Sequence, residues 1–426
     1  MNDSLSRRRF LGRSAAWASL AATLPVSVNV LGANRRLRLA VMGLNGRGSA
    51  LARGFAALED VEVAIACEVD QRVQGKGADA VKDRQATAPR TLADFRQALD
   101  DPSVDALVIA APDHWHAPAT ILACAAGKHV YVEKPASHNP AEGEWMLAAA
   151  RRYHRVVQVG TQRRSMPAII EAIGRVRAGE LGEVKYARAW YNATRGSIGR
   201  GRQAPIPSWL DWDLWQGPAA RRDFRDNLVH YNWHWFWHWG TGELGNNGIH
   251  ALDLCRWGLD ADYPLQVTSG GGRYTFADDQ ETPDTNLVTF DYGDKAIAWE
   301  CQSCRRHGYE GSGFGAAFFG DQGTLVIDGG GCRFYDPADK ETGYVKETSG
   351  DRPHLQDFVE AVREGRRPQA DVEDGHKGAL LCHLGNIAWR MGRALRCDPR
   401  NGRILNDAEA AALWEREYEP GWAPRV

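Results

Sequence analysis

The sequence has no excess of charge of either sign. Its 426 residues include 52 lysines and arginines against 54 aspartates and glutamates, which gives a net charge of −2. Proteins that bind nucleic acids or anionic membranes carry basic surfaces, so we expect neither kind of partner. The chain also lacks low-complexity tracts and internal repeats. Its 43% of hydrophobic residues is ample for a core, and its length predicts two domains.

Apolar runs long enough to span a bilayer are also missing. The stretch from about Trp17 to Val30 is short and rich in alanine and serine, so we expect no membrane anchor. It follows Arg7-Arg8-Arg9-Phe10-Leu11, which is typical of a twin-arginine export signal. We therefore expect residues 1–33 to be removed and the mature protein to be periplasmic or otherwise exported. The alternative is an unexported protein with a chance arginine run.

The cysteines do not form a metal-binding pattern. Of the eight, only Cys301 and Cys304 have suggestive spacing, and a zinc site requires a second such pair or nearby histidines. Alternating polarity across 296–304 predicts a strand, in which residues three apart point to opposite faces. We expect structural thiols and no metal, with a disulfide or a metal site as the alternatives.

Strand and helix signals alternate from residue 36 to 160. Apolar runs typical of buried parallel strands are separated by helical patterns, which predicts a doubly wound Rossmann sheet of class α/β. The predicted strands are Leu37–Met42, Val61–Cys67, Ala106–Ala111, His129–Val132 and Val156–Val159, and the predicted helices are Gly48–Leu58, Leu92–Leu99, Pro118–Ala126 and Pro140–Tyr153.

The pattern changes beyond about residue 165. Strands there follow one another, which predicts an α+β domain with a mainly antiparallel open sheet. We expect residues 34–162 to bind NAD(P) and residues 163–426 to bind substrate and form oligomers. The predicted elements are helices at 167–178, 244–257, 354–363 and 375–393, strands at 183–191, 265–275, 285–292, 295–302, 314–320 and 323–328, and a long loop at 194–240.

The first glycine turn has the spacing of a dinucleotide-binding fingerprint. Gly43-x-Asn45-x-x-Gly48 follows the first strand and opens the first helix, whose N-terminus would face a pyrophosphate. Asn45 replaces the middle glycine, and asparagine tolerates positive φ better than most residues. We expect Gly43, Asn45, Gly46, Arg47 and Gly48 to contact the cofactor. The alternative is a glycine-rich turn without a ligand.

An acidic residue ends the second predicted strand. Glu68 lies about 20 residues beyond the turn, where a carboxylate binds the ribose hydroxyls of a dinucleotide. It would repel a 2′-phosphate, so NAD is favoured over NADP, although Arg72 lies near enough in sequence to offset the repulsion. Asp70 is the alternative acid.

Two later strand ends are expected to complete the pocket, because ligands bind at the carboxyl ends of parallel strands. The first carries Pro112, His114 and His116; helix capping and surface packing are the alternative for the two histidines. The second carries Glu133 and Lys134, and the lysine is placed to bond or shuttle the proton of a substrate hydroxyl. The alternative for Lys134 is an ordinary surface lysine. The Lys134-Pro135 bond is a candidate cis peptide.

A second polar group falls in the helix predicted at 244–257. On a helix, Asn246, His250 and Asp253 share one face, and an imidazole backed by polar groups is suited to acid–base work. The alternative is a capped helix with a satisfied core histidine.

Together these motifs resemble the Gfo/Idh/MocA family of oxidoreductases. The resemblance rests on the glycine turn, Glu133-Lys134-Pro135, Gly160-Thr161-Gln162-Arg163-Arg164 and Gly248-x-His250-x-x-Asp253, in this order over nearly the whole mature chain. It implies that Lys134 and His250 act on a sugar hydroxyl, that Gln162 lies at the cofactor, and that an open sheet forms a homodimer or homotetramer. Many members carry an aspartate where this chain has Asn246, which cannot ionise, so an Asp–His relay is not implied.

Tryptophans are concentrated between residues 209 and 239. Aromatic faces stack on sugar rings, so this segment is a candidate sugar platform, with an aromatic core plug or a subunit interface as the alternative. Arg163, Arg164 and Arg195 would hold a substrate carboxylate or be solvated. The predicted substrate contacts are Lys134, Arg163, Trp233, His234, His238, Asn247 and His250.

The sequence therefore predicts an exported NAD(P)-dependent oxidoreductase that acts on a hydroxyl of a sugar, glycoside or polyol. One alternative is an NAD-dependent glycoside hydrolase, lyase or epimerase that oxidises its substrate transiently. A second is a non-catalytic protein that binds a sugar or a cofactor.

Overall fold

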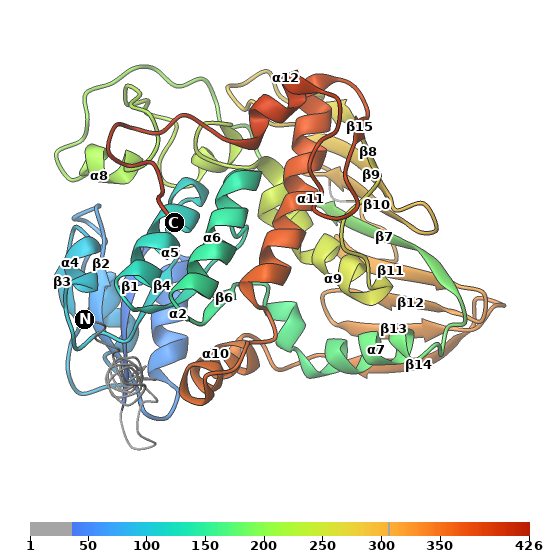
Figure 1. The fold of residues 1–426 in the computed structure, drawn as a ribbon, viewed down its shortest axis with the longest axis horizontal. Helices are drawn as coiled ribbons and strands as arrows, with labels where there is room; N and C mark the ends of the chain where they lie inside the picture. Colours follow the sequence, from blue (N-terminus) through green and yellow to red (C-terminus); the bar gives the residue numbers. More distant parts are fainter. Residues whose placement is uncertain (1–35, 306) are drawn as a thin grey trace, which may run out of the picture. The chain divides into compact units, whose positions relative to one another are not determined.

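The computed structural model describes residues 36–305 and 307–426. The expected export signal, residues 1–33, lies outside the described residues. From Arg36 to Val426 the chain packs as one unit that contains two sheets (Figure 1). One is a six-stranded parallel sheet and the other is nine-stranded and mainly antiparallel. This is the fold class that the sequence predicts.

The parallel sheet has the strand order β3-β2-β1-β4-β5-β6. The order reverses between β1 and β4, which is the point where doubly wound sheets bind ligands. Strands β1, β4 and β5 are almost wholly apolar because helices cover both faces. The strands are β1 (Leu37–Met42), β2 (Val61–Cys67), β3 (Arg90–Leu92), β4 (Ala106–Ile109), β5 (His129–Val132) and β6 (Val157–Val159), and the helices are α2 (Arg47–Ala56), α3 (Lys76–Val81), α4 (Arg96–Leu99), α5 (Asp113–Ala125) and α6 (Pro140–Arg152).

Helix α5 begins five residues before the predicted start at Pro118, which lies inside the helix. A proline donates no backbone hydrogen bond and leaves the carbonyl four residues earlier free. Here that carbonyl belongs to His114, and it accepts a hydrogen bond of 2.7 Å from Arg416 Nη2. A residue from the far end of the chain thus makes the proline compatible with the helix. The prediction of a helix from Leu92 was also wrong, because Leu92 ends β3.

The second sheet has the strand order β14-β13-β12-β11-β7-β10-β9-β8-β15. Among the described strands of this sheet, only β7 and β10 pair in parallel. The hairpin of β13 and β14 was not predicted, since β14 is polar and mostly exposed. The strands are β7 (Val184–Asn192), β8 (Gln266–Gly272), β9 (Thr285–Asp291), β10 (Ala296–Gln302), β11 (Phe314–Gly320), β12 (Thr324–Ile327), β13 (Gly331–Tyr335), β14 (Glu341–Lys346) and β15 (Leu395–Arg396).

Helices cover one face of this sheet and leave aromatic residues on the other. The side chains of Tyr186 and Phe319 stack with ring centroids 5.5 Å apart, and 40% and 38% of their surfaces are exposed. The core lies under α9 and α11. The helical elements are η1 (Gln162–Ser165), α7 (Pro167–Arg177), the π-helical turn η3 (Leu244–Gly248), α9 (Ile249–Leu259), α10 (Arg352–Glu364), α11 (Val372–Met391), α12 (Ala408–Ala411) and η4 (Ala412–Trp414).

The segment 193–240, here called the aromatic insert, folds around a hydrophobic cluster of its own. It contains α8 (Trp212–Gln216) and η2 (Asn232–Trp235). The C-terminal segment runs beside α8 and ends near α5 (Figure 1), where Ala219 bridges Tyr418 and the ring of Trp422 meets Trp115. Among the described helices, none has both the length and the apolar composition needed to cross a bilayer.

Candidate active site

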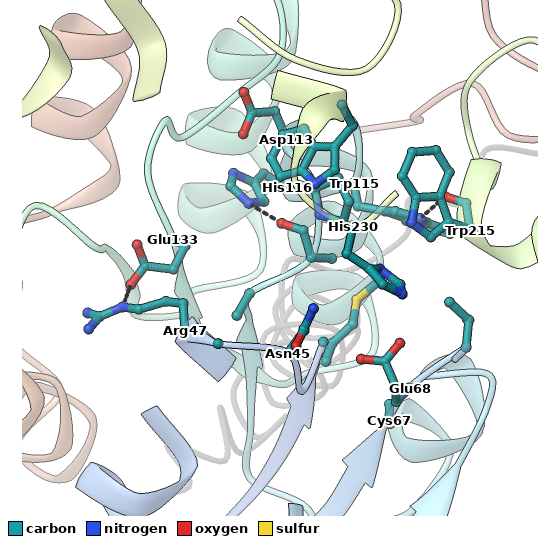
Figure 2. Close-up of a pocket in the computed structure, with 18 of the residues that line it drawn as sticks. Asn45, Arg47, Cys67, Glu68, Asp113, Trp115, His116, Glu133, Trp215 and His230 are labelled. Atoms are coloured by element: carbon teal, nitrogen blue, oxygen red, sulfur yellow. Dashed lines mark hydrogen bonds and ion pairs between the residues drawn. The ribbon is translucent and has the colours of Figure 1, made fainter. Parts of the chain in front are cut away.

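A cavity of about 620 Å³ opens at the carboxyl ends of the parallel strands. Its walls come from the turns after β1, β2, β4 and β5, from the aromatic insert and from η3. Most of the predicted site residues line it, namely Gly43, Asn45, Gly46, Arg47, Glu68, Pro112, His116, Glu133, Lys134, Gln162, Trp233, His234, Asn246 and His250 (Figure 2 shows part of this lining).

The glycine turn is built for close backbone approach. Gly43 has a φ of +85°, and a Cβ there would lie 2.7 Å from the Ala110 carbonyl oxygen. A Cβ on Gly48 would lie 1.7 Å from the Gly43 carbonyl oxygen, so Gly48 packs behind the turn rather than lining the cavity. Asn45 does not take up the positive φ expected of it; the next residue, Gly46, does so with a φ of 39°. Because Gly46 supplies the tight turn, the asparagine side chain is free to accept a hydrogen bond of 2.9 Å from Lys76.

Glu68 is held rigidly beside this turn. One carboxylate oxygen accepts the backbone N–H of Leu44 at 2.7 Å and the other accepts that of Asp70 at 3.0 Å. Each oxygen keeps a lone pair that could accept a ribose hydroxyl. Arg72 does not point at a 2′-phosphate, since its guanidinium donates two hydrogen bonds to Asp70. The site therefore fits NAD.

An arginine from α2 closes the other side of the turn. Arg47 Nε donates to Glu133 at 2.7 Å, and its Nη1 also pairs with Asp351. Burial opposes its charge, but these two carboxylates outweigh burial and raise the pKa of Arg47. Its Nη2 is buried and has no hydrogen-bond partner in the part of the chain that the structure describes. One cationic donor is thus left over at the helix N-terminus, where a pyrophosphate would lie.

The two histidines after β4 have different places. His116 lines the cavity, and its ring nitrogens lie 2.6 Å from the Pro135 carbonyl and 2.9 Å from that of Ala111. His116 therefore fixes the backbone beside Lys134. The prediction that His114 contacts the cofactor is not supported by its position, because it is wholly buried and its Nε2 bonds the Trp215 carbonyl at 2.9 Å.

Lys134 reaches from the end of β5 to the π-helical turn. Its Nζ donates to the Asn246 carbonyl at 2.6 Å and to Asn246 Oδ1 at 3.0 Å. An ammonium has three donors, so one remains for a ligand. The Lys134-Pro135 peptide is cis. The Asn246 Nδ2 is buried and has no hydrogen-bond partner within residues 36–305 and 307–426, although it too can donate.

His250 presents a neutral imidazole to the cavity. Burial, followed by the nearby cation of Lys134, lowers the pKa of His250 well below its usual range. Its Nδ1 is buried without a hydrogen-bond partner among the described residues. A neutral imidazole beside a lysine can take a hydroxyl proton while the lysine stabilises the resulting oxygen charge.

The helix face expected to combine Asn246, His250 and Asp253 is not formed. Leu244–Gly248 is π-helical, which alters the spacing across that turn. Asp253 instead makes a buried pair with Arg164, at 2.7 and 2.9 Å, so neither residue reaches the cavity.

Three of the predicted substrate contacts also lie outside the cavity lining. Arg163 stacks over Phe314 at 4.0 Å, and burial lowers its pKa to about 10. Asn247 donates to Glu243, and His238 Nε2 lies 2.8 Å from the Ala220 carbonyl. Arg195, an alternative carboxylate ligand, pairs with Glu243 at 2.7 Å.

The aromatic insert contains both rings that pack on one another and rings that line the cavity. Trp212, Trp215 and Trp239 pack on one another, and Trp212 and Trp239 contribute nothing to the cavity wall. Trp233 and His234 do line it, and their rings stack with centroids 3.6 Å apart.

Several lining residues were not predicted. His230 and Tyr231 belong to the aromatic insert and line the cavity. The aromatic run predicted a role for this segment of the sequence but did not single out these two residues. Asp113 accepts a hydrogen bond of 2.7 Å from Thr241, and burial raises its pKa. Asp351 comes from the start of α10, and no local sequence signal connects it with the glycine turn.

The cysteines are not joined to one another, and Cys67 lines the cavity. All eight are free thiols, seven of them buried, and Cys301 and Cys304 are not joined. Within residues 36–305 and 307–426, no group of three or more acidic, histidine or cysteine side chains is arranged to hold a metal ion.

Family sequence models agree with this geometry. Residues 37–161 match the NAD-binding Rossmann fold of the Gfo/Idh/MocA oxidoreductase family, and residues 186–296 and 320–423 match its C-terminal α/β domain. The chain belongs to the Gfo/Idh/MocA family. Its parallel-sheet domain is therefore an NAD-binding domain, and the turn, the cavity and Glu68 fit that cofactor.

Individual relatives are distant. The chain is 28% identical over 199 residues to a glycosyl hydrolase family 109 protein of Stenotrophomonas maltophilia. The matched region covers 44% of this chain and only 42% of that protein. It is 24% identical over 377 residues to scyllo-inositol 2-dehydrogenase (NAD(+)) of Bacillus subtilis, covering 85% and 97%. A solved levoglucosan dehydrogenase in complex with NADH and levoglucosan has the same fold, with a TM-score of 0.68, 18% identity and coverage of 85% and 99%.

Proposed function

We propose that this protein is an NAD-dependent oxidoreductase that acts on a hydroxyl group of a sugar, glycoside or polyol. The observation that carries the proposal is the neutral imidazole of His250, whose Nδ1 has no hydrogen-bond partner among the described residues and which shares a cavity with Lys134 and with the dinucleotide turn. The names of the relatives, an inositol and a levoglucosan dehydrogenase, support the same substrate class.

The protein's own residues would handle the hydroxyl proton. Bound NAD supplies a hydride acceptor. Lys134 keeps one donor for the substrate oxygen, since Asn246 takes the other two. His250 accepts the proton as the carbonyl forms, and it starts the reaction neutral because of its burial and the lysine cation. Trp233 and His234 line the same cavity as an aromatic surface for a sugar ring.

A panel of sugars, sugar acids and polyols tests this proposal. Purified protein is incubated with NAD and each compound, and absorbance at the NADH band is followed. Reduction of NAD by at least one carbohydrate is expected. Absence of reduction with every compound, in protein shown to bind NADH, would favour a non-catalytic binding protein or the second candidate.

The second candidate is transient oxidation with elimination or epimerisation, and Tyr231 favours it. Tyr231 lines the cavity with 51% of its surface exposed, and its phenol oxygen accepts a hydrogen bond of 3.0 Å from Arg195. Glu243 holds that guanidinium through Nε at 2.7 Å and Nη2 at 3.1 Å. A fixed cation stabilises negative charge that develops on the phenol oxygen. Tyr231 is thus placed to take a proton from the carbon next to a carbonyl, which plain oxidation does not require.

Solvent exchange separates the two candidates. A 3-keto-glucoside is incubated with the protein in D2O, and proton NMR follows deuterium uptake beside the carbonyl. Uptake that Tyr231→Phe abolishes supports the second candidate; uptake at the buffer rate supports simple oxidation. Because no net redox change is involved, this test does not depend on NADH detection.

Export and assembly are part of the same proposal. The Arg7-Arg8 motif supports twin-arginine export to the periplasm. The exposed Tyr186 and Phe319 on the open sheet support a homodimer or homotetramer through that face. Cell fractionation of the wild type against Arg7→Lys/Arg8→Lys tests export, and light scattering of Phe319→Glu against wild type tests assembly.

A further inference from the structure

The aromatic insert is attached to the Rossmann domain beside the expected ribose site. Gln71 N donates to the Trp209 carbonyl at 2.9 Å, and Asp211 N donates to the Val69 carbonyl at 3.1 Å. Asp70 and Leu210 thereby form a short antiparallel bridge. The loop that follows β2 and Glu68 is thus paired through its main chain with a segment about 140 residues away.

Charged side chains reinforce this bridge. Asp70 is wholly buried, and its carboxylate accepts hydrogen bonds from Arg72 at 2.8 Å and lies 2.6 Å from His230 Nε2. The guanidinium of Arg72 lies 3.2 Å from the centre of the Trp209 ring. A buried carboxylate needs such partners, so separation of the insert would leave Asp70 without His230.

The attachment lies at the cavity itself. Leu214, Trp215 and His230 of the insert line the cavity together with Glu68 and Val69. Figure 2 shows His230, Trp215 and Glu68 among the residues that line the cavity. The residues that follow His230, namely Tyr231, Trp233 and His234, line the cavity with Lys134 and His250. One continuous segment therefore covers both ends.

We propose that the aromatic insert is the second wall of the NAD site and clasps the nucleotide, so that NAD exchanges only when the contacts of Asp70 with His230 and of Arg72 with Trp209 open. The proposal rests on the NAD binding assigned above.

Nucleotide exchange measures the clasp without relying on activity. Protein is loaded with NADH and mixed with excess NAD, and the decay of bound NADH fluorescence gives the release rate. His230→Ala removes the contact to Asp70, and the loss of a hydrogen bond to a charged group corresponds to about 10- to 100-fold faster release. Arg72→Ala, an exposed side chain, is expected to give a smaller increase. Ile206→Ala is the matched control, because Ile206 lies on the insert, is 53% exposed and takes no part in these contacts.

The outcomes distinguish the clasp from NAD binding in general. Slow release in wild type and in Ile206→Ala, with faster release in His230→Ala and Arg72→Ala, supports the clasp. Equal release rates in all four proteins overturn it while leaving NAD binding intact. Failure of the wild type to bind NADH at all would instead overturn the cofactor assignment. If His230→Ala is unstable by thermal melting, Arg72→Ala alone decides between these results.

Discussion

The nucleotide end and the substrate end of the cavity differ in how their polar groups are paired. At the nucleotide end, both oxygens of Glu68 accept backbone N–H groups and Glu133 accepts Arg47. At the substrate end, His250 Nδ1 and Asn246 Nδ2 are buried without hydrogen-bond partners in the described part of the chain. Unpaired buried polar atoms cost free energy, so they are retained where a ligand completes them. Apart from Arg47 Nη2, which faces the expected pyrophosphate, the groups named at the nucleotide end are paired beforehand, whereas the two groups at the substrate end are unpaired.

Replacement of the substrate-end acid–base pair should give the largest effect. His250→Ala or Lys134→Ala is expected to lower kcat by about 10²- to 10⁴-fold, the range for lost acid–base catalysis. The double variant should be scarcely slower than the worse single one, because residues acting as a unit are not additive. NADH affinity, measured by fluorescence, should change little in His250→Ala. A kcat near that of the wild type would show that His250 is only a packed helix residue.

The sequence predicts the nucleotide end better than the substrate end, for a physical reason. Gly43, Gly48 and Glu68 lie within one βαβ unit, where local spacing determines spatial position. The partners that complete this end, Asp351 and His230, come from distant segments and leave no local signal.

At the substrate end the motifs pointed to Lys134 and His250, but the side-chain network was not predictable. His250 and Asp253 both lie in α9, but Asp253 is paired with the buried Arg164, and the π-helical turn alters only the spacing between Asn246 and His250. Trp233 lines the cavity, whereas Trp212 packs in the core of the insert. The aromatic run in the sequence did not distinguish these two tryptophans.

Low pH should lower the stability of both ends of the cavity, because buried neutral histidines pack near each of them. Burial lowers the pKa of His354, under the nucleotide end, to about 3 and those of His376 and His383, behind the substrate end, to about 4 and about 3. Such a group contributes its full stability above the unfolded pKa of about 6.5, and the contribution is lost as the pH falls toward the folded value. The loss approaches about 1.4 kcal/mol per histidine for each pH unit.

Thermal melting at pH 7.5, 6.0 and 5.0 checks this dependence. The melting temperature should fall progressively below pH 6.5, and NADH binding and activity should be lost at the same pH. A melting temperature that is unchanged between pH 7.5 and 5.0 would contradict the role of these histidines. Loss of one function well before the other would show that the two ends unfold separately.

A change confined to the nucleotide end should have a moderate effect. Glu68→Ala removes the acceptor for the ribose hydroxyls and is expected to weaken NADH binding by about 10- to 100-fold, as for a hydrogen bond to a charged group. Discrimination against NADPH should also decrease, because the repulsive carboxylate is gone. Glu62→Ala is the matched control, since Glu62 lies on β2, which Glu68 directly follows, but pairs with Arg38 at 3.0 Å outside the cavity. Titration of both nucleotides into both variants measures the effect; equal affinities in all proteins would place the ribose elsewhere.

The smallest expected effect separates the tryptophans that line the cavity from those that fill the insert core. Trp233→Phe keeps an aromatic face but reduces its area, and a lost aromatic contact of about 0.5–1.5 kcal/mol corresponds to a roughly 2- to 12-fold higher KM for the sugar. Trp212→Phe, in the core of the same insert, should lower the melting temperature and leave KM unchanged, because Trp212 stacks on Trp215 at 4.8 Å and does not line the cavity. Equal KM values for both variants would mean that the insert serves only as packing and that the sugar is held by Lys134, His250 and Asn246 alone.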